Sequence, residues 1–125
     1  MALVLDAGAL VAVDRRDRAV GAMLRVAQQE AIPVRTSAAV VAQVWRDGRR
    51  QANLARVLAG VDAVALDPPT GREVGHLLGR SATADVVDGH LGLIVLQDDT
   101  VLTSDPDDVG RLLRARSVAA RVRRV

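Results

Sequence analysis

Short apolar runs alternate with amphipathic stretches along the whole chain. Residues 2–5 form an aliphatic run that ends at Asp6, a pattern typical of a strand buried on both faces of a parallel sheet. The small residues Ala7-Gly8-Ala9 then lead the chain toward a helix. Further strands are predicted at residues 32–35, 62–67, 100–104 and 117–122, and further helices at residues 19–30, 38–47, 51–59, 70–79, 84–96 and 106–115.

Capping residues mark the starts of two of these helices. Thr36 or Ser37 is placed to cap helix 38–47, and Thr70 and Glu73 have the spacing of a capping box. Strands that alternate with helices predict a three-layer α/β domain, with a central, mainly parallel sheet of four to five strands flanked by helices. The chain has no internal repeat and no linker, so we expect residues 1–125 to form a single domain.

The composition narrows the class of protein. Half of the residues are hydrophobic, yet Phe and Tyr are absent and Trp45 is the only aromatic residue, which we expect to be buried in an aliphatic core. The absence of Cys excludes disulfides, thiolate metal sites and cysteine nucleophiles. No stretch reaches the ~18 apolar residues of a membrane span, and no basic region precedes the first apolar run. We therefore expect a cytoplasmic protein with no membrane partner.

Charge is unevenly distributed along the chain. All 17 basic residues are Arg, and they gather at residues 46–50 and 111–124, while the 15 acidic residues fall mostly in a few short stretches. An acidic centre with basic margins suits a polyanionic substrate bound through its backbone. A solvated surface of mixed charge is the simpler alternative.

Aspartates stand at the ends of the predicted elements. Asp6 ends the first strand, Asp85 and Asp88 lie a turn apart at the start of helix 84–96, and Asp105 and Asp108 directly follow strand 100–104. Taken singly, each is explained as a helix cap or a turn residue. Together they bring carboxylates from separate segments toward one end of the sheet, and hard cations such as Mg²⁺ or Mn²⁺ prefer such ligands.

Four blocks of the sequence, in order, resemble those of PIN-domain ribonucleases, and most closely the VapC-type toxins of bacterial toxin–antitoxin systems. The blocks are Leu3-Val4-Leu5-Asp6, residues 37–46, Asp85-Val86-Val87-Asp88-Gly89-His90-Leu91 and residues 101–108. The resemblance implies a PIN-like fold and an endoribonuclease that depends on Mg²⁺ or Mn²⁺. It also implies neutralisation by a VapB-type antitoxin and a homodimer.

Matched residue by residue, the resemblance implies Asp6, Asp88 and Asp105 as catalytic metal ligands. Asp108 would stand close behind Asp105, and Asp85 would be an auxiliary acid at the rim of the site. Whether one or two ions act stays open.

The chain departs from the family pattern at two positions. Gln43 stands where the family has a glutamate, and an amide keeps one acceptor oxygen but lacks the negative charge. Gly8 stands where a hydroxyl residue is common, so a hydrogen bond near the ligands is expected to be missing. Either a weakened site still binds metal, or the domain is a catalytically impaired module that binds antitoxin or RNA without cleavage. A variant introduced by cloning, to silence a toxic protein, is a further alternative.

Other functions fit the sequence less well. A phosphoacceptor receiver domain needs a lysine, and the chain has none. Neither His76 nor His90 lies near a nucleophile-elbow motif, so each is expected to be a surface or helix-packing residue. In a module that only binds RNA, Arg46, Arg49 and Arg50 are the expected contacts, acting by charge rather than by stacking.

Overall fold

The computed structural model describes all residues 1–125 and contains one five-stranded parallel sheet. The strands stand in the order β3-β2-β1-β4-β5 and every neighbouring pair is parallel. Their bounds are β1 Leu3–Leu5, β2 Val34–Ser37, β3 Asp62–Val64, β4 Thr100–Thr103 and β5 Arg121–Arg124. The predicted class, a three-layer α/β domain around a parallel sheet, is confirmed.

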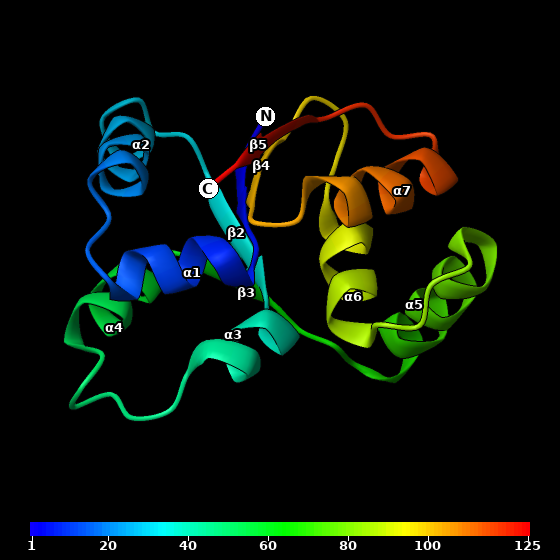
Figure 1. Ribbon diagram of the computed structural model, residues 1–125, viewed down its shortest axis with the longest axis horizontal. Helices are drawn as coiled ribbons and strands as arrows, with labels where there is room; N and C mark the ends of the chain where they lie inside the picture. The colour runs from blue at the N-terminus through cyan, green and yellow to red at the C-terminus, as the bar shows by residue number, and fades with distance from the viewer.

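Seven helices cover the two faces of the sheet (Figure 1). One layer consists of α1 (Ala7–Asp14), α2 (Arg18–Gln29), α3 (Ala38–Val44) and α4 (Ala52–Leu58). The other layer consists of α5 (Pro68–Ser81), α6 (Val86–Ile94) and α7 (Pro106–Arg116). None of these helices combines the length and the apolar character that crossing a membrane requires.

The core lies between the sheet and these two layers and is aliphatic. All three residues of the central strand β1 are buried, and they are flanked in register by β2 and β4. Among the largest fully buried side chains are Leu5, Leu10, Leu54, Leu91 and Leu102. Burial on both faces explains why β1 is a continuous apolar run.

Asp99 directly precedes β4 and lies at the amino ends of the strands. It is 1% exposed, and its carboxylate accepts hydrogen bonds from the backbone N–H of Ala2 (2.8 Å) and of Leu96 (2.8 Å). The same carboxylate pairs with the guanidinium of Arg35 on β2. With these partners a buried charge is tolerated, so this acid is structural.

Local capping sets several element boundaries that differ from the predictions. Ser37 caps α3 as expected, accepting from the N–H groups of Ala39 and Val40. The predicted Thr70–Glu73 capping box is wrong, because Asp67 caps α5 and the helix begins at Pro68. The last strand lies at Arg121–Arg124 rather than at residues 117–122, since Ser117 ends α7 in the left-handed conformation (φ 55°).

Candidate functional site

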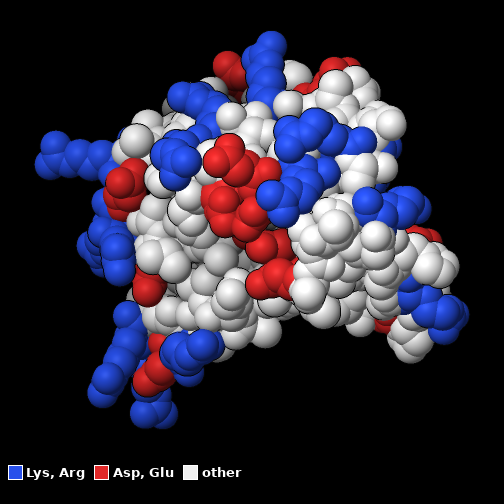
Figure 2. Space-filling model, turned by 45° about the vertical axis from the view of Figure 1, so that its right-hand side comes forward, with Lys and Arg blue, Asp and Glu red and all other residues white.

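Five aspartates from three separate segments of the chain gather at the carboxyl end of the sheet. Asp6 follows β1 and Asp105 follows β4, and these strands are hydrogen-bonded neighbours, so both residues leave the sheet at the same edge. Asp85 caps α6, Asp88 lies in its first turn, and Asp108 lies in the first turn of α7. Figure 2 shows acidic side chains as one patch in the middle of a face, with arginines on both sides.

Asp6 is the most rigidly held of the five. It is 5% exposed; one carboxylate oxygen accepts from the N–H of Ala7 at 2.7 Å, and the other accepts from the hydroxyl of Thr103 at 2.7 Å. The Thr103 oxygen in turn accepts from the N–H of Asp105 at 2.9 Å. Thr103 therefore links the ends of β1 and β4 across the site. Sequence analysis missed this residue, and its only signal was a hydroxyl two residues before Asp105.

The raised pKa of Asp88 shows that the other acidic groups lie close to it. Burial and the charges of Asp85, Asp6, Asp108 and Asp105, in that order of importance, together raise the pKa of this half-buried carboxyl to about 6. Its carboxylate has no hydrogen-bond donor within the protein to offset the repulsion. Asp88 therefore has like charges as neighbours and no oppositely charged partner.

The pKa of Asp108 is also raised by a neighbouring carboxyl group. A hydrogen bond with the Asp105 carboxyl, followed by the charge of Asp105, raises the pKa of Asp108, while Arg111 acts in the opposite direction. Two carboxyl groups this close together give this end of the sheet an excess of negative charge. A divalent cation relieves such repulsion, and every donor offered here is a hard oxygen.

The side chains do not surround an ion as they stand. No group of three or more Asp, Glu, His or Cys residues is arranged to hold a metal. The donor chemistry and the charge therefore suit Mg²⁺ or Mn²⁺, whereas the coordination shell itself is not formed. The metal-ligand roles expected for the five aspartates stay predictions.

Gln43 is exposed on α3, the helix that follows β2. With Ala7, Gly8, Ser104 and Arg46 it lines an open groove of about 830 Å³. Two of these residues directly follow Asp6, and Ser104 directly precedes Asp105. The groove therefore places Gln43 near residues that adjoin Asp6 and Asp105 in the chain, while none of the five aspartates lines it. The role of Gln43 at the metal site stays a prediction.

Gly8 is in close contact with the loop after β4. A Cβ atom at this position would lie 2.5 Å from the Oγ of Ser104 and 2.9 Å from its backbone nitrogen, so no side chain fits. The Ser104 hydroxyl occupies the space that a hydroxyl residue at position 8 would use. From the sequence, a hydroxyl was expected to be missing at position 8. In the structure, Ser104 in the loop after β4 places a hydroxyl next to Gly8.

Trp45 is not buried, and that prediction is wrong. It follows the last residue of α3 with an extended backbone (ψ 131°) and is 37% exposed. The guanidinium of Arg46 folds back onto the carbonyl oxygens of Ala42 (3.0 Å) and Trp45 (2.7 Å). Arg49 and Arg50 are exposed on the loop that follows.

Ser37 and His90 form a buried pair that sequence analysis did not anticipate. The Oγ of Ser37 lies 2.6 Å from the Nδ1 of His90, and both residues are 0% exposed. Burial lowers the pKa of His90 and favours the neutral ring. Because Ser37 already accepts from two N–H groups of α3, its hydroxyl donates to His90. A buried pair of this kind cannot meet a substrate, which confirms His90 as a packing residue.

Parallel strand order, helices on both faces and acidic residues after β1 and β4 together define a PIN-like fold. The chain is similar over its whole length to a chain of VapBC2 from Rickettsia felis, crystallised bound to a DNA fragment from their promoter. The TM-score is 0.68, covering 100% of this chain and 99% of that chain at 12% sequence identity. No protein-family model and no curated protein matches the sequence. The likeness establishes the fold, and the chemistry has to be argued from the residues of this chain.

Proposed function

We propose that the protein is a VapC-type toxin, an endoribonuclease dependent on Mg²⁺ or Mn²⁺, with activity weakened by Gln43. The observation that supports this most is the convergence of Asp6, Asp105 and Asp108 on Asp88, whose pKa they raise together with Asp85. Carboxylates that raise one another's pKa in this way are typical of sites that bind a cation or a proton.

Each acidic residue would have a distinct role. Asp6, Asp88 and Asp105 would hold the ion, with Asp108 and Asp85 at the rim. When bound, the ion would orient water and offset charge on the phosphoryl oxygens. Thr103 would keep Asp6 and Asp105 at a fixed separation through its two hydrogen bonds. Gln43 would contribute an amide oxygen without charge.

The test is a cleavage assay with single-stranded RNA and added Mn²⁺, comparing the unaltered protein with Asp88→Asn. Cleavage that requires Mn²⁺ and is lost in the variant supports the proposal. Asp62→Asn is the matched control, because Asp62 is exposed at the start of β3, away from the acidic residues. Cleavage that survives Asp88→Asn would point to a contaminating nuclease or to a different site.

The alternative is a PIN-like module that binds antitoxin or RNA without cutting. Gln43 favours it, since an amide in place of a carboxylate lowers the affinity for a hard cation. Binding of RNA in the absence of any Mn²⁺-dependent cleavage would support this alternative over the nuclease.

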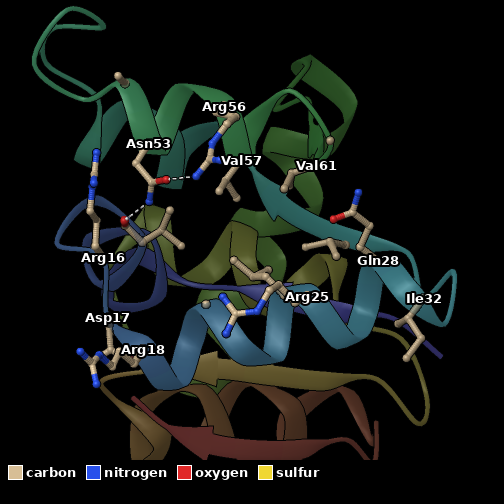
Figure 3. A pocket seen from close by; sticks show the side chains of 16 residues that line it. Arg16, Asp17, Arg18, Arg25, Gln28, Ile32, Asn53, Arg56, Val57 and Val61 are labelled. Atoms are coloured by element: carbon tan, nitrogen blue, oxygen red, sulfur yellow. Dashed lines mark hydrogen bonds between the residues drawn. The ribbon is translucent and has the colours of Figure 1, made fainter.

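A VapB-type antitoxin and a homodimer belong to the same proposal. The partner is supported by a second groove of about 980 Å³ between α2 and α4, shown in Figure 3. Its lining combines aliphatic side chains with Arg16, Arg18, Arg25 and Arg56. Apolar residues framed by arginines suit an amphipathic segment with acidic side chains. Light scattering after gel filtration, with and without a co-expressed antitoxin, tests the dimer and the complex.

A further inference from the structure

Trp45 is the only aromatic residue of the chain, and the fold places it at the surface. At 37% exposure it is among the few large hydrophobic side chains left open to solvent. A lone tryptophan in a protein with an aliphatic core could have filled that core. Its exposure therefore indicates that the ring contacts another molecule.

The ring is supported by Gly48. A Cβ atom at Gly48 would lie 3.0 Å from Cζ2 of the indole and 3.4 Å from Cη2, so the ring packs directly on the backbone of this residue. A side chain at this position would crowd the ring and shift it by a few tenths of an ångström. Part of the ring is thus fixed against the loop while the rest stays open.

Gln51 fixes the loop that presents Trp45. Its side-chain oxygen accepts from the N–H groups of Arg46 (2.7 Å) and Asp47 (3.0 Å). Its amide nitrogen donates to the carbonyl of Val44 (3.1 Å) and to the carboxylate of Asp14 on α1 (3.3 Å). At 9% exposure this residue is buried, so four hydrogen bonds anchor the loop to the domain. An aromatic ring held this way is organised before any ligand arrives.

Arginines flank Trp45 along the chain. Arg46 follows it directly, and Arg49 and Arg50 follow Gly48, which contacts the ring; the side chain of Arg50 is 87% exposed. The carboxylate of Asp47 lies 3.9 Å from Arg50 and also accepts from the N–H of Arg49 at 3.0 Å, which orders the loop but leaves its net charge positive. An exposed ring beside cationic side chains is the combination that binds unpaired nucleotides.

The position of the loop relates it to the acidic residues. The groove lined by Gln43, Gly8 and Ser104 continues to Arg46 and Gln51. Its acidic lining residues are Asp14 and Asp17, and the five site aspartates do not line it, but Gly8 is two residues from Asp6 and Ser104 directly precedes Asp105. A strand bound at the carboxylates would therefore pass Gly8 and Ser104 and reach the loop along this groove.

We propose that Trp45 is a stacking platform for an unpaired base of single-stranded RNA, with Arg49 and Arg50 holding the adjoining phosphates. The inference rests on the proposed function for the identity of its ligand. It adds a residue that contacts the substrate outside the acidic cluster, and it replaces the expectation of binding by charge alone.

Fluorescence of Trp45 is a direct readout, because the chain contains no other aromatic residue. The unaltered full-length chain is titrated in EDTA, where no cleavage occurs, with a short single-stranded RNA of mixed sequence and with a duplex of the same length. We expect the single strand to quench the emission as it binds and the duplex to leave it unchanged, since paired bases are not free to stack.

Variants separate stacking from charge. Trp45→Leu, followed by the anisotropy of a labelled single strand, is expected to weaken binding at least about fivefold with an unchanged salt dependence. Trp45→Phe keeps a ring and should restore most of the affinity. The double variant Arg49→Gln/Arg50→Gln should instead reduce the slope of log affinity against log salt by about 1.4. Leu66→Ala is the control, because Leu66 is also 37% exposed but lies after β3.

The proposal is overturned if Trp45→Leu binds the single strand as tightly as the unaltered protein, or if duplex and single strand quench equally. These binding measurements need no catalysis. If no RNA is ever cleaved but Trp45 stacks, the nuclease proposal fails and the platform stands. If Asp88-dependent cleavage occurs and Trp45→Leu changes neither binding nor quenching, only the platform fails.

Discussion

Asp88→Asn should stabilise the metal-free protein near neutral pH. The pKa of Asp88 is raised from its ordinary 3.8 to about 6 by burial and by four neighbouring carboxylates. A rise of about 2 units corresponds to a ceiling of about 3 kcal/mol, at 1.36 kcal/mol per unit. Because the side chain is only half-buried, solvent screening reduces the gain to about 1–2 kcal/mol. Asparagine has nearly the same shape and removes the charge.

The sign of the effect fixes its pH dependence. The folded protein binds the Asp88 proton more tightly than the unfolded chain does, so the carboxyl imposes no penalty below about pH 4. The penalty grows as the pH rises through the window between 3.8 and about 6, and it is complete above that window. The advantage of Asp88→Asn should therefore be largest near neutral pH and nearly absent near pH 4.

Urea unfolding followed by circular dichroism, in EDTA and at both pH values, measures this difference. Asp62→Asn removes an exposed acid far from the cluster and should change little at either pH. Adding Mn²⁺ should reverse the ranking at neutral pH, since an ion bound only by the unaltered folded protein stabilises it. Equal stabilisation at both pH values, or a loss of stability at neutral pH, would refute the electrostatic explanation of the raised Asp88 pKa.

Three further predictions concern Gln43, Gly8 and His90. Gln43→Glu adds a charge and should tighten Mn²⁺ binding about tenfold; calorimetry that shows no change removes Gln43 from the site. Gly8→Ala should lose about 1–3 kcal/mol in urea unfolding, and Ser104→Gly in the same chain should recover part of it, because the added Cβ would clash with Ser104. The lowered pKa of His90 means that its contribution to stability is lost as the pH falls below 6.5. His90→Leu should abolish that pH dependence in urea titrations while leaving the Ser37 hydroxyl without its acceptor.

The arrangement of Asp6 and Asp105 illustrates how much the sequence could predict. Apolar runs that end at an acid predicted two strands with carboxylates at their carboxyl ends, and a parallel sheet brings such ends to one edge. That β1 and β4 are direct neighbours does not follow from either run. It depends on which strands pair across almost a hundred residues, and only the family resemblance pointed to it.

Asp98 and Asp99 show what local sequence cannot distinguish. The two acids are adjacent, yet Asp98 is exposed with φ 68° in a turn, and Asp99 is 1% exposed with an arginine and two backbone donors. Which of them is buried depends on the register of β1 against β2 and β4. Sequence reasoning that sorts acids by spacing alone has no access to that register.

Trp45 was mispredicted for a different physical reason. Hydrophobicity favours burying the largest apolar side chain, and helix 38–47 was expected to continue past it. The helix instead ends at Val44, and the extended backbone of Trp45 turns its side chain away from the core. The cause lies in Gln51, whose side chain binds the N–H groups that follow Trp45 and substitutes for further helical hydrogen bonds.

Gln43 and the raised pKa of Asp88 have a common electrostatic meaning. Each carboxylate added to this end of the sheet strengthens the affinity for a cation and weakens the metal-free fold, because the same repulsion drives both effects. An amide at position 43 therefore favours the stability of the metal-free fold over the affinity for a cation. Gln43→Glu should therefore lower the free energy of unfolding in EDTA and raise it in Mn²⁺. If the free energy of unfolding changed with the same sign in EDTA and in Mn²⁺, a charge at position 43 would not interact with the five aspartates.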